Sequence, residues 1–353
     1  MGKGIVDAMN AVDFFCGGGG MTRGLLNAGI DVQFGLDFNP SCQNTYEHNN
    51  GIPYLCRDIT QVQPEELLEN YPDLADNDEL LLVGCAPCQP FSNQRHSDHE
   101  HVAVNLLDEF GRMFRAFNPA CVLVENVPGI QRRGHEVFER FLTMLHELNY
   151  HVFYDVVNAK NYGVPQNRKR LILIASREFV PDAPPPTHGE GLEQYVTVRN
   201  AIDHYPAIVA GGFDATYFNH QASSLSTLNT QRIENTPHDG GSRTDWPENL
   251  VLNCHNNGYR GHTDVYGRMM WDSVSPTLTS KCFSISNGRF AHPEQNRAIS
   301  LREAAALQSF PDNYQFFGSV QEIGKQIGNA VPVLLAQHIG EYILAHHENH
   351  QNN

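Results

Sequence analysis

The chain has 353 residues, of which 41% are hydrophobic and 18% charged. This length accommodates one large domain and a smaller one, and each can bury a core. No run approaches the roughly 18 apolar residues that span a bilayer, and the N-terminus lacks the basic and apolar parts of a signal peptide. We therefore expect a cytoplasmic protein with no membrane partner.

The formal net charge is −16 at pH 7, which argues at first sight against a nucleic-acid partner, because phosphate binding needs basic surface. The charge is unevenly distributed, however. Residues 160–302 carry 14 basic and 13 acidic side chains, so the acidic excess lies in the rest of the chain. This middle segment could face DNA while the acidic surface faces away, although ordinary acidic solubility explains the counts equally well.

The 8 cysteines are scattered, and some lie inside apolar runs, such as Cys85 and Cys121. This placement favours reduced core thiols over a disulfide framework. Cys85 and Cys88 also form a Cys-x-x-Cys pair, which can be a redox pair or half of a zinc site. We expect no metal, because no second pair of ligands follows at a suitable spacing. A redox pair is disfavoured because Cys85 falls within an apolar, strand-like run.

Short apolar runs alternate with helix-like segments over the first 176 residues, a pattern typical of βα units and a mainly parallel sheet. Residues 136–150 also have helical periodicity, and their apolar face is expected in the core. The pattern predicts an α/β fold. The strand-like runs are residues 10–15, 32–36, 79–85, 120–125, 151–157 and 171–175. The apolar helix face consists of Val137, Phe138, Phe141, Leu145 and Leu148.

A proline-rich stretch at residues 180–188 interrupts this periodicity, because proline fits neither a helix interior nor a central strand. We expect a domain boundary there. The residues that follow are polar and rich in turn-formers, with short apolar runs at 249–253 and 277–279, which suits a small, irregular, β-containing domain. Helical periodicity returns at 300–308 and 331–346. The expected parts are residues 1–180, 189–294 and 297–353.

A glycine-rich turn follows the first predicted strand, in the run Asp-Phe-Phe-Cys-Gly-Gly-Gly-Gly at residues 13–20. Such a turn between a strand and a helix lets the backbone approach a nucleotide-like ligand, and an acidic residue about 20 positions later can hold ribose hydroxyls. Asp37, at the end of the next predicted strand, fits that position. A purely structural tight turn is the alternative.

Ionisable side chains stand near the ends of three later predicted strands. Cys88 follows one of them, within Pro-Cys-Gln-Pro, at the edge where an open α/β sheet presents its site. Glu125 ends the next, although a lone glutamate there is more often solvated or paired. Alternation places Gln166, Arg168 and Arg170 on one side of the last, which could equally be a solvated basic edge.

These blocks resemble the ordered motifs of the DNA cytosine-C5 methyltransferase family in its prokaryotic form. The chain contains Asp-Phe-Phe-x-Gly-x-Gly-Gly, Pro-Cys-Gln-Pro-Phe-Ser, Glu-Asn-Val, Gln-x-Arg-x-Arg, an Arg-Glu-Ala-Ala-Ala-Leu-Gln run and Gln-Ile-Gly-Asn-Ala-Val-Pro. The resemblance covers about residues 10–176 and 297–345, and the order of the blocks is far more specific than any single one. It implies a Rossmann-like, S-adenosylmethionine-dependent methyltransferase sheet with a smaller, irregular target-recognition domain at residues 189–294.

The resemblance implies S-adenosylmethionine as the cofactor. Asp37 is expected to bind the ribose hydroxyls and Phe38 to lie against the adenine, while Asp58 and Ile59 match the family's adenine-contacting pair. Asn329 is expected to complete the pocket, because the family's C-terminal helix returns to the first domain. The residues implied for cofactor binding are Phe15, Gly17, Gly19, Gly20, Asp37, Phe38, Asp58, Ile59, Pro87 and Asn329.

C5 of cytosine is a poor nucleophile, and a temporary covalent bond at C6 raises its electron density. In the family role that Cys88 matches, a thiolate attacks C6, which requires a lowered pKa or a nearby proton acceptor. Glu125 matches the glutamate that holds cytosine N3 and the exocyclic amine, and we expect burial to raise its pKa. Arg168 and Arg170 are expected to contact the cytosine O2 and neighbouring groups. The group that removes the C5 proton stays open.

The reacting carbon is stacked inside a duplex, so double-stranded DNA is the expected partner and the cytosine must be flipped out. The polar segment 93–105 is expected to close over it, near the DNA-contacting residues Gln89, Ser92 and Arg95. A Thr-Leu pair at Thr277 resembles the family's element that places the flipped nucleotide. Several basic residues are candidates for contacts with phosphates or guanines, and a phosphate or plain surface position is favoured for each. They are Arg232, Arg243, Arg260, Arg268, Lys281 and Arg289.

Two other functions stay open. The family's tRNA-methylating branch carries a Cys-Phe-Thr element, and Cys282-Phe283-Ser284 is close to it but has serine for threonine. A silent DNA-binding regulator would have lost Cys88, Glu125 or the glycine turn, and none is lost. We expect a prokaryotic or phage enzyme that is monomeric and nucleoid-associated, with a restriction nuclease for the same site as a candidate partner. The recognition sequence and the biological role are not predicted.

Overall fold

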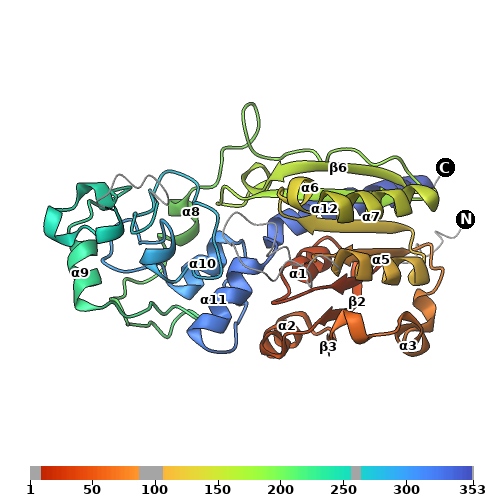
Figure 1. Cartoon of the computed structure of the whole chain (residues 1–353), viewed down its shortest axis with the longest axis horizontal. Coiled ribbons are helices and arrows are strands. Elements are labelled where there is room, and N and C mark those ends of the chain that lie inside the picture. The colour runs from red at the N-terminus through yellow and green to blue at the C-terminus, as the bar shows by residue number, and fades with distance from the viewer. Residues whose placement is uncertain (1–8, 87–105, 256–263, 352–353) are drawn as a thin grey trace, which may run out of the picture. The chain divides into compact units, whose positions relative to one another are not determined.

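The computed structural model describes residues 9–86, 106–255 and 264–351. The chain divides into two compact units (Figure 1). The first unit comprises Met1–Asn158, Lys169–Pro186 and Val333–Asn353, and the second comprises Ala159–Arg168 and Thr187–Pro332. The change of unit after Pro186 falls within the proline-rich stretch. The second unit is therefore an insertion between segments that belong to the first.

A seven-stranded sheet with the order β3-β2-β1-β4-β5-β7-β6 forms the first unit (Figure 1). Strands β1 to β5 are parallel, and β7 pairs antiparallel with β5 and β6. Strand order reverses at β1, and open α/β sheets bind ligands outside the carboxyl ends of the strands at such a point. The strands are β1 Asn10–Phe14, β2 Asp31–Asp37, β3 Tyr54–Cys56, β4 Leu80–Gly84, β5 Cys121–Asn126, β6 His151–Asn158 and β7 Lys169–Ser176.

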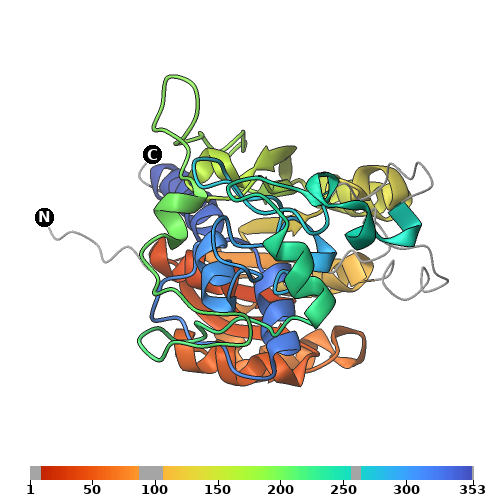
Figure 2. The same ribbon diagram turned by 90° about the vertical axis from the view of Figure 1, so that its left-hand side faces the viewer.

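Alternation along β1 explains how both faces of the sheet are covered. Phe14 meets Phe110 of α5 edge-to-face, with ring centroids 5.9 Å apart, whereas the adjacent Asp13 accepts a hydrogen bond from Thr22 of α1. Helices α5 and α7 thus lie on one face, and α1, which packs on α12, lies on the other (Figures 1 and 2). The helices are α1 Gly20–Asn27, α2 Gln43–Asn50, α3 Pro64–Asn70, α5 Leu106–Phe117, α6 Ile130–Arg133, α7 His135–Glu147 and α12 Val333–Gln351.

These elements confirm the predicted α/β class and the mainly parallel sheet. The sequence pattern does not predict β3, because three residues carry too little periodicity to be recognised. It also assigns Leu148 to the apolar face of α7, but Leu148 is 40% exposed because the helix ends at Glu147. The other residues of that face, such as Phe138 and Phe141, are buried as expected.

The second unit has little regular secondary structure. Pairing between extended segments is limited, over its described residues, to isolated bridges such as Gln166 with Ser275 and Arg268 with Ala291. The apolar run at 249–253 lies in and between two 3-10 turns rather than in a strand. The helices of this unit are α8 Val198–Ile202, α9 Thr227–Glu234, α10 Leu301–Leu307 and α11 Val320–Asn329.

Buried arginines of this unit donate hydrogen bonds to backbone carbonyl groups, which strand partners would bind in a regular sheet. Arg168, Arg268, Arg297 and Arg302 are among the largest fully buried side chains, and all four belong to the second unit. An irregular chain leaves carbonyl groups without a strand partner, and one guanidinium has five N–H donors that can bind several of them. Arg268 donates to the backbone oxygens of Ile233, Thr236, His292 and Gln295 and to Asn296 Oδ1.

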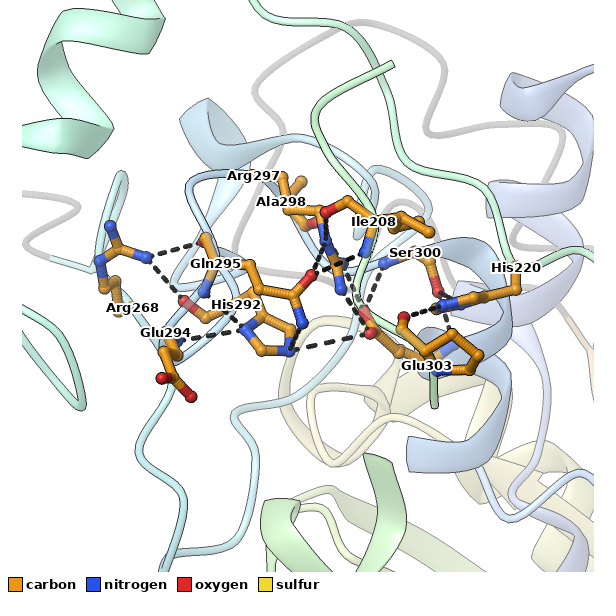
Figure 3. A network of polar contacts seen from close by, with 11 residues as sticks. Ile208, His220, Arg268, His292, Glu294, Gln295, Arg297, Ala298, Ser300 and Glu303 are labelled. Atoms are coloured by element: carbon orange, nitrogen blue, oxygen red, sulfur yellow. Dashed lines mark hydrogen bonds and ion pairs between the residues drawn. The ribbon is translucent and has the colours of Figure 1, made fainter. Parts of the chain in front are cut away.

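Figure 3 shows how this network continues to the start of α10. Arg297 donates from both terminal nitrogens to Glu303, each at 2.7 Å, and Glu303 also accepts from the backbone N–H of Ser300 at 2.7 Å. Burial alone would raise the pKa of Glu303, but the hydrogen bonds from Arg297 lower it to about 2. Burial lowers the pKa of Arg268, which donates to carbonyl oxygens and an amide oxygen, to about 10. The second unit is therefore organised around internal cations.

Candidate functional site

The glycine-rich turn connects β1 to α1 at the carboxyl edge of the sheet. Its backbone is left-handed at Phe15 (φ 65°), Gly17 (φ 51°) and Gly19 (φ 85°). Such a φ is unfavourable for a phenylalanine, and backbone strain of this kind gathers at functional sites. A Cβ on Gly17 would meet no atom within 4 Å, so the turn borders open space. The backbone of this turn is therefore accessible to a ligand.

Asp37 and Phe38 lie beside this turn at the end of β2. The backbone N–H of Gly17 donates to Asp37 Oδ2 at 3.0 Å, and that of Asn39 donates to Oδ1 at 2.9 Å. Burial raises the pKa of Asp37. Phe38 is 67% exposed, which leaves its ring available to pack on a flat ligand. The structure thus brings together the glycine turn and the acidic residue that the spacing predicts.

Asp58 and Ile59 follow β3, the strand next to β2. Asp58 Oδ1 accepts hydrogen bonds from the backbone N–H and the hydroxyl of Thr60, at 3.0 and 2.8 Å, and so begins the 3-10 turn Ile59–Gln61. Ile59 is buried in the core of the first unit. An open glycine turn, two carboxylates and an exposed ring along one edge of the sheet fit a cofactor that contains adenosine.

A buried carboxyl group, for which the sequence pattern predicts no role, lies beneath the glycine turn. Asp13 is fully buried, its Oδ2 accepts from the Thr22 hydroxyl at 2.7 Å, and that hydroxyl also lies 2.9 Å from the Tyr46 hydroxyl. Burial raises the pKa of Asp13 to about 7. The available signal is an acidic residue inside an otherwise apolar strand. Asp13 ties together β1, α1 and α2 below the turn.

Glu125 and Arg170 form a largely buried ion pair at the carboxyl end of β5. Arg170 Nε lies 2.8 Å from Glu125 Oε1, and the two side chains are 13% and 11% exposed. The antiparallel direction of β7 explains the contact, because β7 begins where β5 ends, with Leu171 opposite Asn126. The pair therefore lies at the same edge of the sheet as the glycine turn.

The alternation pattern predicts that Gln166, Arg168 and Arg170 lie on one side of a strand. In the structure, Gln166 and Arg168 precede that strand and lie apart from this pattern. Strand β7 begins only at Lys169, so the alternation does not extend to them, and both are buried in the second unit. Gln166 Oε1 accepts from the backbone N–H of Leu278 at 3.0 Å. Arg168 donates to the carbonyl oxygens of Leu278, Gly328 and Ala330. These contacts argue against a direct contact of Arg168 with the cytosine.

Several residues predicted for the site lie outside the described residues. They are Pro87, Cys88, Gln89, Ser92, Arg95 and Arg260. The described chain reaches Ala86, whose carbonyl oxygen lies 3.5 Å from Asn126 Nδ2. Asn126, a member of the Glu-Asn-Val block for which the sequence predicts no separate role, therefore holds the chain shortly before Cys88.

The predicted DNA-contacting residues of the second unit differ in their surroundings. Thr277 and Lys281 are exposed, and the Thr277 hydroxyl donates to the carbonyl oxygen of Asn167 at 2.6 Å. Arg268 is fully buried and bound to backbone oxygens, which argues against its predicted contact with DNA. Arg232 and Arg289 also donate to carbonyl groups of this unit. The count of basic residues at 160–302 therefore overstates the positive charge on the surface.

Asn329 is the exposed last residue of α11 in the second unit, and its role in cofactor binding stays a prediction. The cysteines of the described ranges are free thiols. Across those same ranges, no three His, Cys, Asp or Glu side chains gather as they would around a metal ion. None of the helices described is both long and apolar enough to cross a membrane.

The strand order defines an α/β protein with a Rossmann-like sheet. The model of the C-5 cytosine-specific DNA methylase family matches residues 9–345, and the chain belongs to that family. It is a DNA (cytosine-5-)-methyltransferase, as its ordered motifs predict.

Relatives of the chain agree with this assignment. The chain is 43% identical over 339 residues to the type II methylase M.HgiDII of Herpetosiphon aurantiacus, a match that covers 94% of each. It is 32% identical over 349 residues to the type II methyltransferase M1.HphI of Haemophilus parahaemolyticus, covering 96% of this chain and 87% of the relative.

Two solved structures support the fold alone, because their sequence identities are low. A structure described as a DNA modification methyltransferase encoded within an E. coli prophage matches with a TM-score of 0.72 at 20% identity, covering 98% of this chain and 100% of its own. The S. pombe Dnmt2 methyltransferase matches with a TM-score of 0.62 at 16% identity, covering 97% and 99%.

Proposed function

We propose that this enzyme transfers a methyl group from S-adenosylmethionine to C5 of a cytosine flipped out of a specific short DNA sequence, through a covalent bond between Cys88 and C6. The observation that carries the proposal is the Glu125–Arg170 ion pair. It stands at the carboxyl end of β5, and the neighbouring parallel strand β4 ends shortly before Cys88 in the sequence. A nucleophile and a carboxyl group are thus expected at one edge of the sheet.

The chemistry follows from these side chains. The Cys88 thiolate forms a bond to C6, which moves electron density through the ring toward C5 and N3. Glu125 holds N3 and the exocyclic amine, and a proton shared with N3 offsets the negative charge that develops there. Arg170 keeps the Glu125 carboxyl in one orientation through their 2.8 Å contact. After C5 has gained the methyl group, loss of its proton and departure of the Cys88 thiolate restore the aromatic ring.

Residues of the first unit fit the cofactor. When bound, S-adenosylmethionine supplies an activated methyl group on a sulfonium. The glycine turn from Gly17 to Gly20, with Phe15, offers backbone that a ligand can approach, and Asp37 can accept hydrogen bonds from ribose hydroxyls. Phe38 offers an exposed ring for the adenine, next to Asp58 and Ile59. We assign Pro87 to the same site by its match to the family motif.

The second unit supplies the DNA specificity in this proposal. Flipping a base costs a few kcal/mol, which contacts with DNA must offset. The exposed Thr277 and Lys281 are available for such contacts. By their places in the sequence we also assign Gln89, Ser92, Arg95 and Arg260, which lie outside the described ranges, to DNA contacts. Because the similar proteins are type II enzymes, we assign the chain to restriction-modification, as a cytoplasmic monomer paired with a nuclease for the same site.

The environment of Cys282 argues against this residue as the nucleophile. This residue heads the Cys-Phe-Ser sequence that approaches the element of the RNA-acting branch. Its side chain is fully buried, and burial raises the pKa of its thiol to about 12. A thiol held in that state is a poor nucleophile. Cys88 therefore stays the candidate nucleophile.

A methylation assay tests the proposal. The enzyme would be incubated with labelled S-adenosylmethionine and either unmethylated genomic DNA or total tRNA, and methylated cytosines would be located by bisulfite sequencing. We expect label in DNA at one short recurrent sequence, and none with Cys88→Ser. Label in tRNA alone would replace DNA by RNA as the substrate, and no label in either would support a silent regulator.

A further inference from the structure

An arginine on α5 contacts the turn that carries Asp58 and Ile59. Arg112 Nη2 donates a hydrogen bond to the carbonyl oxygen of Ile59 at 2.8 Å. Its Nε donates to Glu109 Oε2, one turn earlier on the same helix, at 2.9 Å. The Arg112 side chain is 33% exposed, so its head group is partly shielded from water. The contact joins two segments that are far apart in the sequence.

The turn that receives this hydrogen bond is short, and the Asp58 side chain holds its first residues while leaving the Ile59 carbonyl group to other donors. It is a single 3-10 turn of three residues, Ile59–Gln61, and a piece this short gains no cooperative stability from its own backbone. The backbone N–H of Val62 reaches the Ile59 oxygen only at 3.4 Å, a long hydrogen bond. The shorter, charge-assisted bond from Arg112 is therefore the stronger restraint on this carbonyl group.

We infer that Arg112 is a positioning residue that fixes Asp58 and Ile59 for recognition of the adenine end of the cofactor. The inference rests on the proposed cofactor site. Arg112 reaches the backbone of Ile59 from α5, and the Ile59 side chain is buried in the same core cluster as Leu107 and Phe110 of that helix. It acts through the turn, so its removal should alter affinity for the adenine base rather than the rate of methyl transfer.

The test compares Arg112→Met with the wild-type enzyme by calorimetric titration of S-adenosylhomocysteine and of S-inosylhomocysteine, which carries an oxygen in place of the adenine amino group. We expect about tenfold weaker binding of the adenosyl ligand and a smaller preference for it over the inosyl ligand. The value of kcat at saturating S-adenosylmethionine should stay within about twofold. Arg112→Lys retains a donor for the Ile59 oxygen and should restore most of the affinity.

Arg140→Met serves as a matched control, because Arg140 on α7 forms an ion pair with Asp108 of α5 that is largely exposed, at 54% and 39%. It should leave the affinity for both ligands unchanged. Wild-type affinity and selectivity in Arg112→Met would overturn the inference and leave the proposed function intact. So would an equal loss for both ligands, since general loosening of the fold weakens both alike. Failure of the wild-type enzyme to bind either ligand would instead refute the proposed cofactor site.

Discussion

At the scale of single residues, the site depends on carboxyl groups that neighbouring segments hold by ion pairs or hydrogen bonds. Glu125 is held by Arg170 from the antiparallel strand β7, and Asp37 is held by the backbone of the glycine turn. Such second contacts fix the orientation of a functional group before its ligand arrives, which lowers the cost of reaching the reactive geometry. Asn126, next to Glu125, holds the backbone of Ala86 through its side-chain amide.

Replacing Glu125 by glutamine should lower kcat by about 100-fold or more, since an amide cannot share a proton with cytosine N3 as a carboxyl group can. Binding of S-adenosylhomocysteine should not change. Rates with saturating DNA and calorimetric affinities would measure both. Asp155→Asn is the control, because Asp155 is an exposed carboxylate on the edge strand β6 of the same sheet. Full activity of the glutamine variant would exclude the role assigned to Glu125.

At the scale of elements, α1 owes its position to close contact with α12. Gly24 allows this contact, since a Cβ there would lie 2.4 Å from the Ala336 Cβ and 2.6 Å from the Val333 carbonyl oxygen. The glycine turn leads directly into α1, so its geometry depends on this helix pair. The packing of α1 on α12 therefore fixes the position at which the glycine turn ends.

Gly24→Ala should destabilise the first unit by about 1–3 kcal/mol, because backbone must move to admit the methyl group. Gly111→Ala on α5 is the matched control, because its Cβ would first meet the flexible end of Met144, at 3.1 Å. Chemical denaturation of both variants measures the difference. Equal stabilities would mean that the α1–α12 contact tolerates a larger side chain.

The buried arginines of the second unit lead to a separate prediction. Arg268→Met should lower the free energy of unfolding of that unit by about 3 kcal/mol, since it leaves several buried carbonyl groups without a donor. Lys281→Met, at an exposed position, should leave stability unchanged and weaken DNA binding. Denaturation curves and binding titrations distinguish the two. A stable Arg268→Met variant that binds DNA weakly would instead support the contact with DNA that the sequence predicts.

The sequence predicts the strand runs and the glycine turn because each has a local signal, namely a period of two residues or a cluster of glycines. It does not predict that β7 runs antiparallel, and that direction is what brings Arg170 to Glu125. It also misjudges Arg268, because a basic residue in a polar segment looks the same whether it faces water or carbonyl groups. Contacts between distant segments leave no local pattern.

At the scale of the whole molecule, the last helix completes the first unit after the insertion of the second. His347, near the end of α12, lies between Glu79 before β4 and Glu178 after β7, with 2.5 Å to each carboxylate. Burial alone would lower the pKa of His347, but the hydrogen bonds that its ring donates to the two glutamates raise it above the usual value. This contact ties the C-terminal helix to the edge of the sheet away from the glycine turn.

This contact should make stability depend on pH. A raised pKa means that the folded protein binds the His347 proton more tightly, so the stabilisation is complete below the unfolded value, about 6.5, and is lost as pH rises through the folded value. The stability difference between the wild type and His347→Gln should therefore be larger at pH 6 than at pH 9. Denaturant midpoints at both values test this. His135→Gln, in an exposed pair with Glu139, should show little change.

Covalent trapping on Cys88 tests the central claim most directly. DNA amplified with 5-fluorocytosine in place of cytosine presents every target site with a fluorine at C5, which cannot leave as the proton does. With S-adenosylmethionine, we predict a protein–DNA complex that survives denaturing electrophoresis, with peptide mapping placing the nucleotide on Cys88. Absence of the complex in an enzyme that methylates ordinary DNA, or attachment at another residue such as Cys282, would contradict the mechanism.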